Sequence, residues 1–223
     1  MAPGHVVGHV GLPSSVPVVH AITNDEIIGH PDFIDTACAV MRVLGARGAL
    51  HLRTSPMMRD RFGAIAEALS AAQTITGAWL VINDSIEVAL RVNAKGVQLN
   101  SRSLPVAEAR LQAENIFLGA SVRDGAESVA SARAGADWLV AGQAFAGTGT
   151  SSEDARNATW LKSLTQSVRV PVIAIGGVRV EHAEILHAAG VYGVAIIRGI
   201  WNAANAEQAA SDYLSAYERA VSR

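Results

Sequence analysis

Short apolar runs alternate with amphipathic segments along most of this chain. The runs are rich in valine, isoleucine and leucine at nearly every position, which is typical of parallel strands buried on both faces. They predict eight strands, at 16–23, 48–53, 78–83, 96–99, 116–121, 138–142, 170–175 and 193–197.

The segments between these runs place apolar residues three or four positions apart, the spacing of one face of a helix. Three predicted helices are clearest: 58–75 with Phe62, Ile65, Ala66, Leu69 and Ala72 on one face, 124–134 with Ala126, Val129, Ala130 and Ala134, and 206–221 with Ala210, Tyr213, Leu214, Tyr217 and Val221. Asn205 is expected to cap the last helix, with Gln208 as its capping-box partner. Ser103 and Pro105 mark another helix start.

Strict alternation of strands and helices favours a single-domain (β/α)8 barrel, a TIM barrel, over residues 16–223. A doubly wound open sheet is the alternative. That fold would carry a glycine-rich turn after its first strand, whereas Thr23, Asn24 and Asp25 follow the strand here. Residues 1–15 are rich in Gly, Pro and His and are expected to form a flexible tail.

Composition narrows the function classes. A net charge of −2 gives no reason to expect nucleic acid or an acidic membrane as a partner. No apolar run approaches the roughly 20 residues that span a bilayer, and the start lacks a signal-peptide pattern, so a cytoplasmic protein is expected. Cys38 excludes an internal disulfide and, on its helical pattern, is expected to be a buried structural thiol.

Glycines close the last two predicted strands. Gly176 and Gly177 follow the seventh, and the eighth ends at Ile197, with Arg198 and Gly199 after it. In (β/α)8 barrels the loops after these strands, with a short extra helix, commonly bind phosphate, because glycine lets backbone N–H groups approach an anion. We expect a phosphorylated small-molecule ligand at the C-terminal face.

Few polar residues follow the other strands, and each has a structural alternative. His51 and Arg53 alternate on strand two, so both are expected at the barrel mouth, although Arg53 could simply pair with Asp84. Asn83 and Asp84 could be only a helix cap. Gln98 is as well suited to an internal hydrogen bond as to ligand contact. The remaining candidates are Ser121, Gln143 and the loop 146–154, which contains Thr148 and would form either a mobile lid or a solvated loop.

Taken together, these strand ends resemble the thiamine phosphate synthase/TenI family. The resemblance rests on ordered motifs: His-Ala-Ile-Thr at 20–23, His-Leu-Arg at 51–53, Ile-Asn-Asp at 82–84, Gly-Val-Gln-Leu at 96–99, Gly-Ala-Ser-Val at 119–122, Ala-Ile-Gly-Gly at 174–177 and Gly-Val-Ala-Ile-Ile at 193–197. It implies a thiazole phosphate held at Gly176, Gly177, Ile197 and Arg198. In the synthase branch it also implies a hydroxymethylpyrimidine diphosphate with Mg²⁺, in a pocket matched by Arg53, Asn83, Asp84 and Ser121.

Departures from that family pattern affect the expected reaction. Ser55 stands where the synthases have a lysine, Ser103 where they have a metal-binding aspartate, and 150–152 where they have a further lysine. Because a departing diphosphate needs cations, these changes disfavour pyrimidine transfer. Asp84 alone is a poor magnesium site, so no cofactor is expected except Mg²⁺ in the synthase case.

The other branch contains the thiazole tautomerases, which move a proton on a thiazole carboxylate phosphate. Gln143 stands where these have their histidine, and an amide does not titrate near neutral pH, so it would only orient substrate. His51 then becomes the candidate proton carrier. Our first expectation is a tautomerase-like isomerase. The alternatives are a thiamine phosphate synthase, in which Arg102 or Arg123 supplies the missing charge, or an inert paralogue that binds a phosphorylated ligand for regulation. A more distant option is another phosphate-binding barrel, and a homodimer is plausible.

Overall fold

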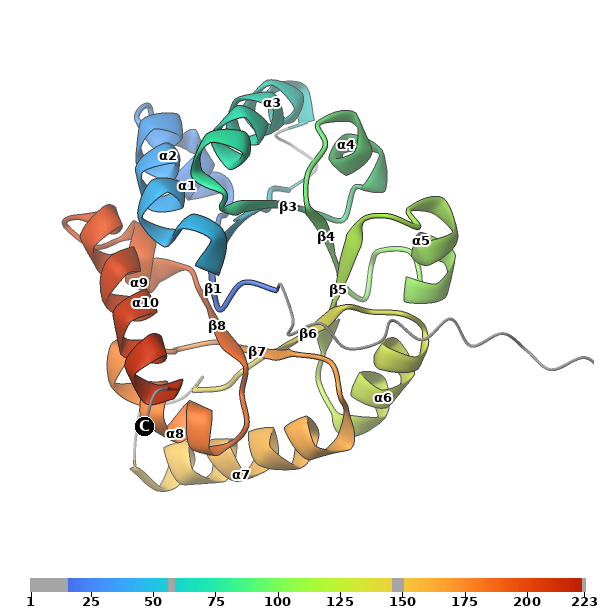
Figure 1. Cartoon of the computed structure of the whole chain (residues 1–223), viewed down its shortest axis with the longest axis vertical. Coiled ribbons are helices and arrows are strands. Elements are labelled where there is room, and N and C mark those ends of the chain that lie inside the picture. Colours follow the sequence, from blue (N-terminus) through green and yellow to red (C-terminus); the bar gives the residue numbers. More distant parts are fainter. Residues whose placement is uncertain (1–15, 56–58, 146–150, 222–223) are drawn as a thin grey trace, which may run out of the picture.

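The eight predicted strands form a closed barrel of parallel strands (Figure 1). The computed structural model describes residues 16–55, 59–145 and 151–221. The strands are β1 (Val19–Ile22), β2 (Gly48–Leu52), β3 (Trp79–Asn83), β4 (Gly96–Leu99), β5 (Phe117–Val122), β6 (Trp138–Ala141), β7 (Val172–Ile175) and β8 (Gly193–Ile196). Because β8 pairs with β1, the (β/α)8 barrel is confirmed and the open sheet is excluded.

Helices surround the barrel on its outside (Figure 1). They are α1 (Asp25–Gly29), α2 (Phe33–Leu44), α3 (Arg59–Thr76), α4 (Ile86–Arg91), α5 (Val106–Gln112), α6 (Gly125–Arg133), α7 (Ser151–Ser167), α8 (Ala183–Ala188), α9 (Arg198–Trp201) and α10 (Ala206–Val221), with short 3-10 turns η1 (Gly45–Arg47) and η3 (Val180–His182). The last helix, α10, packs beside α2, which joins the two ends of the helical ring. The predicted tail, 1–15, lies outside the described residues.

Aromatic side chains fill the inside of the barrel. Trp79 and Trp138 lie with their ring centres 6.5 Å apart, and His20 and His51 pack beside Trp138. Space for Trp138 comes from Gly119, where a Cβ atom would lie 2.2 Å from the indole ring. The interior of the barrel is therefore a packed core. It contains branched aliphatic side chains, as is usual for this fold, and also two tryptophans.

The predicted apolar face is confirmed in α3 but not in α6. In α3 the residues Ile65, Ala66, Leu69 and Ala72 are buried, as expected. In α6 the prediction is wrong, because the buried residue is Ser128, whose hydroxyl donates to Asp124 O at 2.6 Å. Ala130 and Ala134 of that helix face the pocket described below. Apolar spacing alone cannot distinguish a face turned to the core from one that lines a cavity.

α10 follows the predicted pattern except at its edges. Ala210, Tyr213 and Tyr217 are buried, whereas Leu214 is half-buried and Val221 is exposed. Asn205 Oδ1 accepts from Gln208 N at 2.9 Å, which confirms the cap. The Gln208 side chain instead donates to Asp212, so the reciprocal half of the capping box is not formed by it.

Two further predictions need correction. Cys38 is half-buried instead of buried, although it packs against core residues and its pKa is raised by burial. Ser103 does not cap α5, since the residue before that helix is Pro105 and the Ser103 hydroxyl donates to Asp84.

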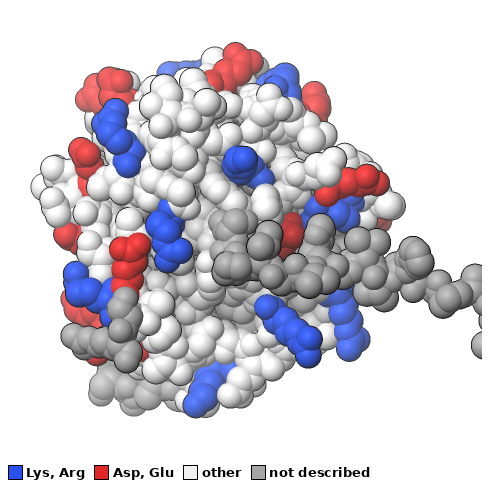
Figure 2. Space-filling model, in the orientation of Figure 1, with Lys and Arg blue, Asp and Glu red and all other residues white. Residues whose placement is uncertain are grey.

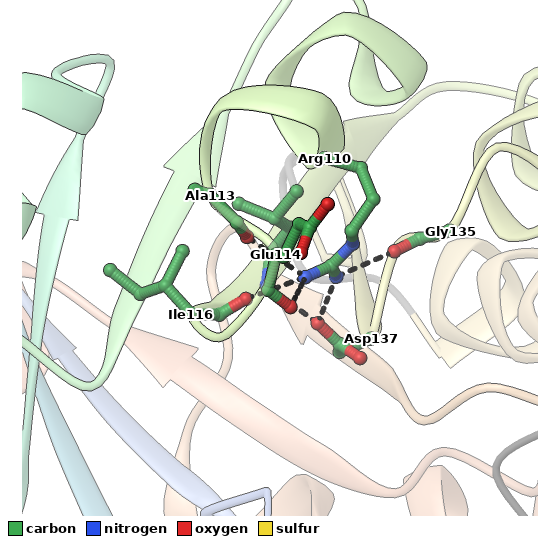
Figure 3. A network of polar contacts seen from close by, with 7 residues as sticks. Arg110, Ala113, Glu114, Ile116, Gly135 and Asp137 are labelled. Carbon is green, nitrogen blue, oxygen red and sulfur yellow. Dashed lines mark hydrogen bonds and ion pairs between the residues drawn. The ribbon is translucent and has the colours of Figure 1, made fainter.

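The N-terminal end of the barrel is tied together by Arg110 of α5 (Figure 3). Its guanidinium donates to Ile116 O at 2.7 Å, Gly135 O at 2.8 Å and Asp137 Oδ2 at 2.6 Å. The same carboxylate oxygen accepts from Leu118 N at 2.7 Å. One side chain thus links the end of α5 to the starts of β5 and β6, at the end of the barrel opposite to the candidate site.

Candidate functional site

A pocket of about 820 Å³ opens at the C-terminal ends of the strands and continues outward between the β4–α5 segment and α6. This is the end at which (β/α)8 barrels carry their active sites. The residues at the barrel mouth are Ile22, Arg53, Asn83, Gln98, Ser121, Val140, Gly142, Ile175 and Ile197, and the outer part includes Arg102, Ser103, Leu104, Arg123, Ala130 and Ala134.

Arg53 lies at the mouth as expected, with its side chain exposed. Its backbone is fixed by Thr23, whose hydroxyl donates to Arg53 O at 3.1 Å and accepts from Arg53 N at 2.9 Å. Among the described residues Arg53 forms no ion pair with Asp84, so the structural alternative for this arginine is wrong. Its guanidinium forms no ion pair among the described residues, although its charge adds to the hydrogen bonds from Ser55 and Thr54 in lowering the pKa of Asp25.

Asp84 sits beside the mouth and holds the β4–α5 segment. Its Oδ1 atom accepts from Asn100 Nδ2 at 2.6 Å and from the Ser103 hydroxyl. It is not a helix cap, because Ser85 caps α4 by accepting from Val88 N. Its φ of 65° is unusual for a residue with a side chain, and such backbone outliers cluster at functional sites.

Gln98 is engaged within the barrel wall. Its Nε2 atom donates to Ser121 Oγ at 3.1 Å and to Leu99 O at 3.2 Å, and its Oε1 accepts from Trp138 Nε1 at 2.9 Å. The internal hydrogen-bond interpretation of Gln98 is therefore the one the geometry favours. Ser121, which accepts one of these bonds, lines the pocket and is exposed there.

His51 lies inside the barrel, below the mouth at which it was expected. The ring is fully buried, and its Nε2 atom is 2.7 Å from Nδ1 of His20. Burial and the neighbouring His20 hold the pKa of His51 well below its ordinary value. His20 was missed from the sequence as a partner. The parallel register, which places it between Ala49 of β2 and Ala195 of β8, brings it to the barrel axis.

The glycine-ended loop after β7 is held close to the β6 loop. Gly176 and Gly177 have φ values of 107° and 63°, and a Cβ atom on Gly177 would lie 2.2 Å from Phe145 O. The pocket lining reaches Ile175 and Ile197, directly before Gly176 and Arg198. Arg198 is exposed and begins α9, the short extra helix expected at this place.

Gln143 follows β6 with a φ of 61° and an exposed side chain. Its neighbour Gly142 lines the pocket. Thr148 lies outside the described residues, so its expected substrate contact stays a prediction. The expected loop 146–154 is shorter than predicted, because α7 already begins at Ser151.

Positive charge at the site comes from arginines. Arg53, Arg102 and Arg123 all line the pocket, and Arg123 pairs with Glu127 at 2.7 Å. On the face shown in Figure 2, the described basic and acidic side chains are interspersed, in agreement with the small net charge.

The donor set for a magnesium ion is incomplete. Asp84 provides a carboxylate, but Ser103 replaces the second carboxylate and donates its proton to the first. No group of three His, Cys, Asp or Glu side chains suited to a metal occurs among the side chains that the structure describes, in 16–55, 61–145 and 157–221. These residues do not by themselves fit Mg²⁺, which is usually bound by carboxylates together with substrate phosphates.

The chain is similar to known proteins along most of its length. Residues 19–200 match the family described as thiamine monophosphate synthase. The chain is 31% identical over 213 residues to the thiamine-phosphate synthase of Roseiflexus castenholzii, covering 93% of this chain and 91% of that one. It is 32% identical over 214 residues to the thiamine-phosphate synthase of Salinispora arenicola, covering 91% of this chain and 98% of the relative.

A solved structure, the thiamine phosphate pyrophosphorylase from Pyrococcus furiosus, superposes with a TM-score of 0.78 at 25% identity, over 93% of this chain and 98% of that one. No helix in the described part of the chain is long and apolar enough to cross a membrane. The family match, the relatives and the barrel geometry agree, and the chain belongs to the thiamine monophosphate synthase family.

Proposed function

We propose that this protein is a thiamine phosphate synthase, which joins hydroxymethylpyrimidine diphosphate to a thiazole phosphate. The observation that carries the proposal is the gathering of Arg53, Asn83 and Ser121 in one pocket, with Asp84 beside it. These are the positions at which the family resemblance places the pyrimidine diphosphate. The relatives named thiamine-phosphate synthase support this reaction over the tautomerase reaction that was our first expectation.

In this reaction the ring nitrogen of the thiazole bonds to the methylene carbon of the pyrimidine. The bond from that carbon to the diphosphate oxygen breaks, and diphosphate leaves with the electron pair. We assign the thiazole phosphate to Gly176, Gly177, Ile197 and Arg198, because positive-φ glycines let backbone N–H groups approach an anion. Arg53 is placed to neutralise charge on the departing diphosphate.

Arg102 is the further cation for the leaving group. It lines the outer part of the pocket with an exposed side chain, whereas Arg123 there is already paired with Glu127. Arginine gives planar, bidentate contacts to phosphate oxygens, so it can replace part of the charge lost with the family's lysines. We route no step through a metal, because Asp84 and Ser103 do not form a magnesium site alone.

A thiazole tautomerase is the second candidate, favoured by Ser55 and Ser103 at the positions of a synthase lysine and aspartate. Its proton carrier has no clear source among the described residues. Gln143 does not titrate, and His51 is fully buried and bonded to His20.

The test is a pair of reactions on one purified sample. Thiazole carboxylate phosphate is given alone in the first reaction, and thiazole phosphate is given with hydroxymethylpyrimidine diphosphate and Mg²⁺ in the second. Thiamine phosphate in the second reaction supports the synthase. Proton rearrangement in the first reaction without thiamine phosphate in the second supports the tautomerase, and binding without turnover supports the inert paralogue.

An Arg102→Ala variant refines the synthase test, with Arg133→Ala on the outside of α6 as its matched control. Loss of one charge-assisted contact to the leaving group is expected to lower kcat about 10- to 100-fold. Unchanged kcat in Arg102→Ala would remove this arginine from the mechanism and leave the synthase assignment standing.

A further inference from the structure

A line of polar groups runs through the inside of the barrel and ends at the pocket. Pro17 O lies 2.9 Å from His20 Nε2, and His20 Nδ1 lies 2.7 Å from His51 Nε2. Both rings are fully buried. Asn83, which lines the pocket, lies close enough to His51 to affect its pKa.

The contact between His51 and Asn83, at the pocket end of this line, leaves two polar atoms without hydrogen-bond partners among the described residues. Neither His51 Nδ1 nor Asn83 Oδ1 has a hydrogen-bond partner among the described residues, although both atoms are buried. Buried polar atoms without partners lose their hydrogen bonds to water without replacement, so such an arrangement calls for an explanation. The oxygen and nitrogen of an asparagine amide are assigned from their surroundings, so the surroundings determine which atom faces His51.

The ring nitrogen that carries the proton in each histidine follows from the contact between Pro17 and His20. Pro17 O only accepts, so His20 carries its proton on Nε2. In a neutral ring Nδ1 is then a bare acceptor, and His51 donates Nε2–H to it. A neutral His51 is left with a bare Nδ1, which needs a donor.

If His51 were doubly protonated, its Nδ1–H would instead donate to Asn83 Oδ1. Burial disfavours that charge, and His20 further lowers the pKa of His51. Among the described residues no acidic group acts on either ring, so none of them compensates the charge.

We infer that the His20–His51 pair fixes the amide of Asn83, with Nδ2 donating to His51 Nδ1 and Oδ1 turned to the pocket. His20 and His51 are thus positioning residues, and the pocket presents a hydrogen-bond acceptor at this point. The ligand group that meets Asn83 is a donor, such as an amine, an amide N–H or a protonated ring nitrogen. The inference rests on the proposed function only for the identity of that ligand.

Nitrogen-15 NMR of the ligand-free full chain at neutral pH tests the inference without any substrate. We expect both rings to be neutral with protons on Nε2. Nitrogen–nitrogen couplings are expected across two hydrogen bonds, His51 Nε2–H to His20 Nδ1 and Asn83 Nδ2–H to His51 Nδ1. A proton on His51 Nδ1 would overturn the inference. Failure of the synthase assay would leave these signals unaffected, so the two proposals are tested separately.

Asn83→Asp provides a second test, because a carboxylate cannot donate to Nδ1. His51 is expected to become doubly protonated at neutral pH in this variant. Asn93→Asp is the matched control, since it adds the same charge at an exposed turn before β4 and should leave the histidine signals unchanged. A neutral His51 with Nε2–H in Asn83→Asp would show that the amide does not contact the ring.

Discussion

Single side chains at the barrel mouth decide which chemistry the pocket supports. Ser103 shows this most directly, because its hydroxyl donates to the carboxylate of Asp84 where the family has a second carboxylate. The exchange removes one negative charge and replaces a repulsive pair by a hydrogen bond. A serine at position 103 therefore favours local stability and disfavours metal binding, whereas a carboxylate there would do the reverse.

Ser103→Asp is expected to destabilise the ligand-free protein and to create Mg²⁺-dependent stability. Two adjacent carboxylates repel, and a divalent cation relieves the repulsion. We expect a Tm about 2–4 °C lower without metal, which corresponds to about 1 kcal/mol for a chain of this size, with recovery in Mg²⁺. Thermal unfolding with and without Mg²⁺ measures both effects. Ser103→Asn is the control, and an equal Mg²⁺ response in this variant would contradict the explanation.

His20 predicts how stability depends on pH. Burial lowers its pKa to about 4 from 6.5. Between these values the unfolded chain binds a proton that the native protein does not, so stability falls as pH decreases from 6.5 to about 4. The shift corresponds to roughly 3 kcal/mol over that window. Urea unfolding from pH 7 to 4 measures it, and a flat profile in wild type, or an unchanged slope in His20→Gln, would contradict the assignment.

At the scale of elements, the loops after β7 and β8, to which we assign the thiazole phosphate, contact α10. The Tyr213 hydroxyl donates to Val178 O at 3.1 Å, one residue after Gly177. It also lies against Gly199, where a Cβ atom would be 2.4 Å from the hydroxyl oxygen. One buried side chain thus supports the loops after both β7 and β8.

Tyr213→Phe is therefore expected to weaken substrate binding more than chemistry. The loss of one hydrogen bond should cost about 1 kcal/mol of stability and raise the KM for the thiazole phosphate several-fold, with kcat nearly unchanged. Steady-state kinetics separates the two constants. Tyr192→Phe is a useful comparison, since its hydroxyl donates to Val16 O, away from these loops. An equal rise of KM in both variants would show a general loss of stability.

Arg110 fixes the opposite end of the barrel without touching the pocket. Arg110→Met leaves the carbonyls of Ile116 and Gly135 and the carboxylate of Asp137 without their shared donor. We expect a loss of about 2–4 kcal/mol in the free energy of unfolding, with KM unchanged in the folded protein. Urea unfolding measures the loss. Arg133→Met, on the exposed side of α6, controls for removing a charge and should change stability by less than about 0.5 kcal/mol.

At the scale of the whole molecule, closure of the barrel is expected to make the chain unfold as one cooperative unit. β8 pairs with β1, and α10 packs beside α2, so the last helix completes the first part of the fold. Truncation after Asn205 would remove the buried side chains of Tyr213 and Tyr217. We expect such a chain to lose its cooperative thermal transition, whereas truncation after Val221 should keep it. A sharp transition in the shorter chain would mean that α10 is only an addition to a stable barrel.

The sequence by itself determined the eight strands, their order and the end of the barrel that carries the site. Continuous apolar runs indicate strands buried on both faces, and glycines at strand ends indicate close backbone approach, so both signals are local. Arg53, Asn83 and Ser121 were predicted at strand ends, and they line the pocket there. The motifs also indicated the family.

Only the tertiary structure decided which polar groups face each other. His51 lies below the mouth because the parallel register brings His20 from β1 to the barrel axis, and the partner is 31 residues away in the chain. Gln98 is held by Trp138, 40 residues later, and Ser103 pairs with Asp84 instead of capping α5. These contacts form when closure of the barrel brings together strands that are distant in the sequence. The apolar periodicity of one segment does not indicate which other strand its polar side chains will face.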